Sequence, residues 1–160
     1  MTPAIADIPD TYRPSPYYVQ RVSDFTAGST FLVTSQPNFD AKDVFLVAGK
    51  LGYHGFQRIE TFRDYMPDWD FNRGQPMSEL AYRWMCEFLK CVELPAGKRP
   101  SVFLASSGNL ELAWEDNIGS KYQAEFGPSA IEFFRDNTGA EGIAEASDAG
   151  VREVAQILSV

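Results

Sequence analysis

The chain has 160 residues, of which 44% are hydrophobic, 14% aromatic and 22% charged, a composition that suits one folded domain with a sizeable core. It contains no run of about 18 apolar residues, so we expect no membrane-spanning helix. Residues 1–10 lack the basic and apolar regions of a secretory signal, and we therefore expect a cytoplasmic protein.

The net charge of −8 is unevenly distributed along the chain. Residues 1–110 hold 12 acidic and 11 basic side chains, whereas residues 111–160 hold 10 acidic and 3 basic ones. An acidic surface repels phosphate backbones, so direct binding of nucleic acid is not expected. The same surface suits a partner protein with a basic surface, although a solvated face that only confers solubility would look alike.

The N-terminal part contains four of the ten prolines within residues 1–18. Proline fixes its own φ and disfavours helix in the residue before it, which predicts an extended or disordered segment. We expect a single α+β domain over residues 19–160. The apolar runs at residues 17–25 and 29–37 are typical of a β-hairpin.

The next segment is ambiguous. The run VFLVA at residues 44–48 fits a buried strand or a short helix. Gly49, Gly52 and Gly55 then predict a loop, and the near-helical spacing of apolar residues after them predicts a short helix over residues 56–66.

Residues 76–94 give the clearest helical signal, with Pro76 expected at the first helical position. Apolar residues recur with a period near 3.6 and form one stripe: Leu80, Ala81, Trp84, Met85, Phe88, Leu89 and Val92. Cys86 and Cys91 lie about 140° apart around such a helix, so we expect free thiols rather than a disulfide.

Four strands are predicted next, over residues 101–105, 109–115, 121–126 and 130–135, because apolar and polar residues alternate in them between short turn-rich connectors. The chain closes with a helix capped by Ser147 or Asp148, whose stripe is Val151, Val154, Ala155 and Leu158. The predicted fold is α+β: an antiparallel meander of four or more strands with helices packed on one face.

The segment PDWDFNRGQP, residues 67–76, allows two interpretations. Asp68 and Asp70 could bind a divalent cation, but such ions need several oxygen ligands. A turn explains the segment more simply, with Trp69 buried, Asp70 and Asn72 accepting backbone hydrogen bonds, and Gly74 in a conformation that other residues avoid. We favour the turn.

This turn, the following helix and the motifs GNLELAWED and KYQAEFGPSAIEFF together resemble a group of small uncharacterised bacterial and mobile-element proteins. Their pattern is a W-D turn, an amphipathic helix and a four-stranded meander, matched over about residues 60–160. The chain departs from it at Phe71, where the group usually has glycine, and at Ser129 and Ala130, where it has Asp-Gly. The resemblance implies a fold and no established activity.

His54, the single histidine, could act as a general base on a glycine-flanked loop. One histidine without a nucleophile defines no catalytic set, and the chain lacks G-x-S-x-G, G-x-G-x-x-G and HExxH motifs. One histidine and two poorly spaced cysteines also exclude a zinc site by ordinary standards. We therefore expect no catalytic residue, metal or cofactor.

The outward face of the predicted meander remains as a candidate partner-binding surface: Glu111, Gln123, Glu125, Glu132 and Phe134. The leading hypothesis is a non-enzymatic acidic protein-binding module, such as a phage or mobile-element inhibitor or antitoxin-like protein, that masks a basic surface of a nucleic-acid-handling protein. Two alternatives stay open. One is a small hydrolase or transferase using His54 with Asp68 or Asp70, and the other is a structural subunit that homodimerises through the sheet edge.

Overall fold

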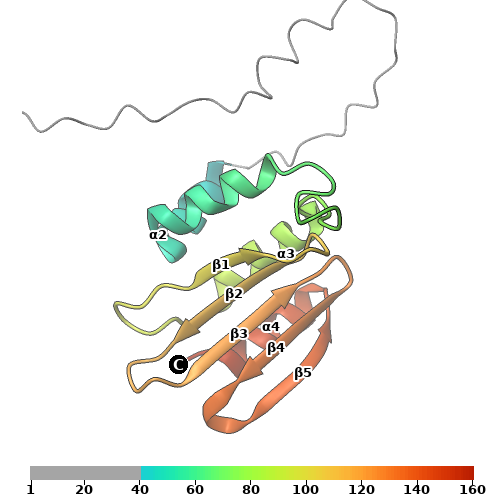
Figure 1. Ribbon diagram of the computed structural model, residues 1–160. Helices are drawn as coiled ribbons and strands as arrows, with labels where there is room; N and C mark the ends of the chain where they lie inside the picture. The colour runs from blue at the N-terminus through green and yellow to red at the C-terminus, as the bar shows by residue number, and fades with distance from the viewer. Residues whose placement is uncertain (1–40) are drawn as a thin grey trace, which may run out of the picture. The chain divides into compact units, whose positions relative to one another are not determined.

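The sheet is an antiparallel meander in which each strand pairs with the next one along the chain (Figure 1). The structure is a computed structural model that describes residues 41–160, so the expected extended segment and hairpin lie outside the described residues. The strands are β1 (Ser101–Leu104), β2 (Leu110–Glu115), β3 (Lys121–Phe126), β4 (Ala130–Arg135) and β5 (Ala140–Glu145). The predicted α+β class with a meander of four or more strands is confirmed.

The fifth strand, β5, was not predicted. Its sequence, AEGIAE, contains alanine, glycine and glutamate, which are all depleted in strands, and a short 3₁₀ helix, η1 (Asp136–Thr138), connects it to β4. The full six-residue register with β4, from Ala130 opposite Glu145 to Arg135 opposite Ala140, makes this segment a strand. Tertiary pairing therefore outweighs local propensity here.

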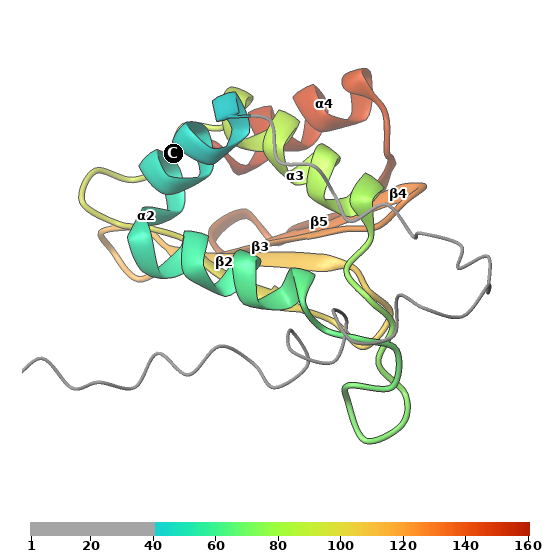
Figure 2. The same cartoon turned by 90° about the horizontal axis from the view of Figure 1, so that it is seen from above.

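Two helices, α3 (Glu79–Cys91) and α4 (Asp148–Leu158), cover one face of the sheet, as predicted (Figure 2). The inward residues of the strands meet them in a core whose largest fully buried side chains include Tyr122, Phe88 and Phe126. The predicted stripe of α4 is confirmed, since all four of its residues are buried. Ser147 is the N-cap, and its hydroxyl accepts a hydrogen bond from the Gly150 N–H.

The start of α3 differs from the prediction. Pro76 lies before the helix, and Ser78 is the N-cap because its Oγ accepts a hydrogen bond from the Ala81 N–H at 3.3 Å. The stripe is also displaced: Leu80 is exposed, whereas Tyr82 and Cys86 are buried. The buried stripe of α3 is wider than predicted because α3 packs against one other helix besides α4, as well as against the sheet.

That other helix is α2 (Ala41–Arg63), and it corrects the prediction for the glycine-rich segment. The ambiguous run at residues 44–48 is helical, and the expected loop at Gly49, Gly52 and Gly55 is absent. Only Gly52 leaves helical geometry, with φ 73° and ψ 175°, and it kinks the helix. The predicted helix over residues 56–66 is the second half of α2 and ends at Arg63.

The second half of α2 lies along β1, the first edge of the sheet (Figures 1 and 2). The Arg58 guanidinium lies over the ring of Phe103 in β1, 5.0 Å from its centroid, and 5.6 Å from the Phe62 ring centroid. The helix therefore flanks the β1 edge, a common way of protecting an edge strand.

Candidate functional site

The candidate site is the open face, defined here as the face of the sheet opposite α3 and α4. The strand register places five of its residues in one line across the sheet: Phe103, Glu111, Glu125, Glu132 and Ile143. Glu111 lies directly opposite Glu125, and Glu125 lies directly opposite Glu132. We call Glu111, Glu125 and Glu132 the acidic row.

The acidic row juxtaposes like charges, which is unfavourable between neighbouring strands. Glu111 is partly buried, and this burial, together with the Glu125 carboxylate, raises the pKa of the Glu111 carboxyl. Glu125 accepts a hydrogen bond from the Asn109 side-chain amide at 2.9 Å. No cation is paired with any of the three carboxylates among residues 41–160.

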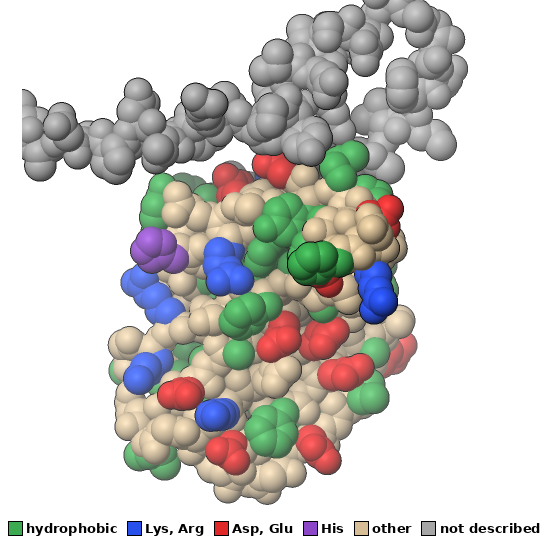
Figure 3. Space-filling model, in the orientation of Figure 1, with side chains coloured by type: hydrophobic (Ala, Val, Ile, Leu, Met, Phe, Trp, Pro, Cys, Tyr) green, Lys and Arg blue, Asp and Glu red, His purple; other side chains and the backbone are tan. Residues whose placement is uncertain are grey.

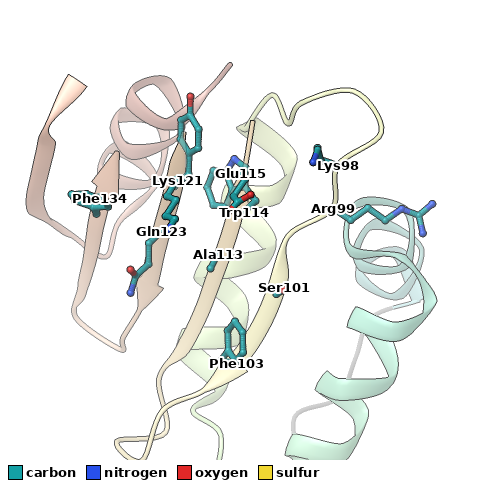
Figure 4. A pocket seen from close by; sticks show the side chains of 11 residues that line it. Lys98, Arg99, Ser101, Phe103, Ala113, Trp114, Glu115, Lys121, Gln123 and Phe134 are labelled. Carbon is teal, nitrogen blue, oxygen red and sulfur yellow. The ribbon is translucent and has the colours of Figure 1, made fainter. Parts of the chain in front are cut away.

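Gln123 and Phe134 belong to the adjacent line across the sheet, where they face each other. They line a shallow groove of about 440 Å³ on the open face (Figure 4). Phe103 on β1 and Phe134 on β4 lie at opposite sides of this groove, with Ala113 of β2 between them. Both rings are exposed, at 40% and 36% respectively, and offer apolar contact area beside the acidic row.

The charge of the open face is strongly asymmetric. Strand alternation and register place these acidic side chains on it: Glu111, Glu115, Glu125, Glu132, Glu141 and Glu145. Figure 3 shows acidic side chains distributed over the sheet in this view, with basic side chains mainly toward one side. Lys98, Arg99 and Lys121 line the groove, and Lys121 pairs in register with Glu115.

The sequence located the five predicted partner-binding residues on one face, and the alternation of burial in β2 and β3 agrees with that. Sequence reasoning missed that Ile143, Glu141 and Glu145 extend the same face, because β5 was not predicted. It also missed Phe103, although its position between the buried Val102 and Leu104 was a readable signal.

The residues of the alternative catalytic hypothesis share no hydrogen bond within residues 41–160. His54 is exposed on helix α2 rather than on a loop, and its ring lies 6.3 Å from that of Tyr53. Among residues 41–160 its imidazole makes no hydrogen bond or ion pair. The groove on the open face is lined by none of His54, Asp68 and Asp70.

Residues 67–76 form a turn, but Gly74 has a different role in it from the predicted one. The residues with positive φ are Asp68, Phe71 and Asn72 rather than Gly74. Glycine is required at position 74 because a Cβ there would lie 2.5 Å from the Trp69 indole nitrogen. Trp69 is only half-buried, and its indole N–H donates to the Gln75 carbonyl at 2.8 Å.

The two cysteines are free, with Cys86 buried and Cys91 exposed. Burial raises the pKa of the Cys86 thiol to about 12, so this thiol is unreactive at neutral pH. Within residues 41–160, no group of three or more His, Cys, Asp or Glu side chains is placed to hold a metal ion. The helices of this same region are too short or too polar to cross a bilayer.

Comparisons with models of known protein families, with curated proteins and with solved structures each found no match. The resemblance to the group with the W-D turn therefore stays a prediction.

Proposed function

We propose that this chain is a non-enzymatic protein-binding module whose open face binds a basic surface of another protein. The observation that carries this proposal is the acidic row, in which three carboxylates stand directly opposite one another on three adjacent strands. A free protein gains nothing from this arrangement, because like charges opposite each other on neighbouring strands are destabilising. A basic partner would relieve the repulsion and gain from charge complementarity.

The groove beside the acidic row supports the same proposal. Phe103 and Phe134 expose aromatic surface next to the carboxylates, and aromatic residues are enriched in protein interfaces. A partner could thus bury apolar area at the groove while its lysines and arginines meet the acidic row.

We further propose that the partner handles nucleic acid, and that the chain masks its binding surface. Adjacent strands lie about 4.8 Å apart, so the acidic row repeats negative charge at a spacing of the same order as one DNA strand, which carries one charge per about 3.4 Å of helix axis. Basic surfaces that bind nucleic acid are suited to such a repeat. In this role the chain is an inhibitor, because its acidic face competes with nucleic acid for the basic surface of the partner.

The test begins with an affinity pull-down from the native host and identification of captured proteins by mass spectrometry. The triple variant Glu111→Lys, Glu125→Lys and Glu132→Lys should abolish capture of the partner. The matched control reverses Glu79, Glu93 and Glu153, which are exposed on the helical side of the sheet, and so changes net charge equally. The control should retain the partner.

Surface plasmon resonance then measures the effect of salt. Screening limits the field of exposed charges to about 8 Å at physiological ionic strength, so raising salt should slow association with the wild type. Thermal melts of both triple variants check that they fold. If the row reversal binds as tightly as wild type, the open face is solvated surface and the proposal is wrong.

A further inference from the structure

The two edges of the sheet differ. Edge strand β1 is flanked by helix α2, whereas no described element pairs with the outer side of β5 (Figure 1). An uncovered edge strand presents unpaired backbone N–H and C=O groups that can pair with another chain.

A loop hydrogen bond beside β4 and β5 fixes the direction of their backbone groups. The Ala146 N–H donates to the Ser129 carbonyl at 3.0 Å, which makes residues 129 and 146 a hydrogen-bonded pair between β4 and β5. Hydrogen-bonded pairs alternate along antiparallel strands, so Ala144 and Gly142 also face β4. The N–H and C=O groups of Glu141 and Ile143 therefore point away from the sheet, and neither residue has another hydrogen bond within the described chain.

The side chains of this edge restrict what can pair with it. Ile143 is 71% exposed and lies between the exposed Glu141 and Glu145 on the open face. Antiparallel self-pairing with the fullest overlap would place Ile143 opposite its copy and Glu141 opposite Glu145, twice. Like charges directly opposite are destabilising, which disfavours homodimerisation through this edge.

We propose that β5 accepts an extended segment of a basic partner as a sixth strand. This inference rests on the proposed function and states how the partner is bound. Three residues of the segment, at every second position, lie opposite β5. A lysine or arginine lies opposite Glu145, an apolar residue opposite Ile143, and a second lysine or arginine opposite Glu141. Its backbone bonds to the outward groups of Glu141 and Ile143, and its basic side chains extend the contact toward Glu132, which faces Ile143 in register.

The direct probe is a capped heptapeptide, Thr-Lys-Thr-Val-Thr-Lys-Thr, titrated into the full chain and followed by NMR. The amides of Glu141 and Ile143 should shift and become protected from hydrogen exchange. An analogue N-methylated at valine and both lysines has the same charge but lacks the donors toward β5. It should bind about tenfold more weakly, because its backbone hydrogen bonds are lost.

The matched protein variants are Ile143→Pro and Ile143→Ala. Both remove the apolar side chain, but only proline removes the outward N–H, and proline is tolerated where an edge N–H faces solvent. Ile143→Pro should weaken peptide binding about tenfold relative to Ile143→Ala. If Ile143→Pro fails to fold, the comparison of the two peptides on the wild type decides alone.

The outcomes separate this inference from the proposed function. Equal binding of both peptides, or equal binding by both Ile143 variants, overturns strand addition, while loss of binding in the acidic-row reversal would still support the charged face. Absence of any binding by the first peptide also overturns strand addition and assigns Glu141 and Glu145 to protection of the edge against aggregation. In that case the pull-down of the proposed function stands as a separate test.

Discussion

At the residue scale, Glu111 shows how the fold opposes ionisation of one carboxylate. Its pKa is raised by partial burial and by Glu125 on the neighbouring strand. A carboxyl whose folded pKa lies above its unfolded value, about 4.3 for glutamate, favours folding most at a pH below that unfolded value. This contribution is lost as the pH rises through the folded pKa.

We therefore predict that Glu111→Gln stabilises the free protein by about 0.5 kcal/mol at pH 7, where it removes one repelling charge. The gain over wild type should shrink as the pH falls through the raised folded pKa of Glu111 and should be lost below about 4.3, because Glu111 is then protonated in both folded and unfolded wild type. Urea unfolding of both proteins across this pH range measures the difference.

Glu115→Gln is the matched control in the same strand, since Glu115 faces Lys121 in register. Removing this favourable pairing should lower stability slightly at pH 7. If Glu111→Gln is also destabilising at pH 7, the acidic row is not a source of repulsion, and the energetic basis for a basic partner disappears.

At the element scale, the connection between α2 and α3 is organised by Trp69. Its ring lies 4.9 Å from that of Tyr65 between centroids, packs against the core, and donates its N–H to Gln75. The Asp68 N–H donates to the Gly74 carbonyl at 2.6 Å and closes the same turn. The turn thus depends on one half-buried indole.

We predict that Trp69→Ala lowers the free energy of unfolding by about 2 to 3 kcal/mol, less than the 3 to 5 kcal/mol typical of a fully buried tryptophan. Trp69→Phe keeps one aromatic ring but loses the second ring of the indole and the N–H donor, so it should cost less than Trp69→Ala, about 1 kcal/mol. Chemical denaturation measures both. An unchanged midpoint for Trp69→Ala would show that the turn is not structural and would favour a functional role for Asp68 and Asp70.

At the scale of the whole molecule, Arg135 joins the sheet to the helical layer. It is the last residue of β4, and its Nη1 donates to the Ile157 carbonyl at 2.6 Å and to the Ser159 carbonyl at 3.3 Å. The guanidinium also lies 5.2 Å from the Tyr122 ring centroid. A cation at the C-terminus of α4 satisfies free carbonyls and opposes the negative end of the helix dipole.

We predict that Arg135→Met lowers stability by about 2 kcal/mol, because charge-assisted hydrogen bonds between the layers are lost. Arg152→Met, at an exposed position of α4, is the matched control and should change stability by about 0.5 kcal/mol or less. Calorimetry of the two variants gives the comparison. Equal melting temperatures would show that Arg135 does not couple the layers.

Local sequence patterns were sufficient to predict an element and its buried face where the apolar periodicity matches the burial in the structure. The alternation in β2 and β3 and the stripe of α4 predicted both the elements and the faces that they bury. The alternation of apolar and polar residues also places Glu111, Glu125 and Glu132 on the face opposite the core, because successive side chains of a strand point to opposite faces of the sheet.

Only the tertiary structure decided the rest. Glycines at positions 49, 52 and 55 indicate a loop locally, but packing against α3 and β1 keeps the segment helical with a single kink at Gly52. Strand β5 has weak propensity and exists through its ladder with β4. The register, which no single strand encodes, aligned the acidic row and ended it at Ile143, on an edge with which no described element pairs, because register depends on both strands and the turn between them.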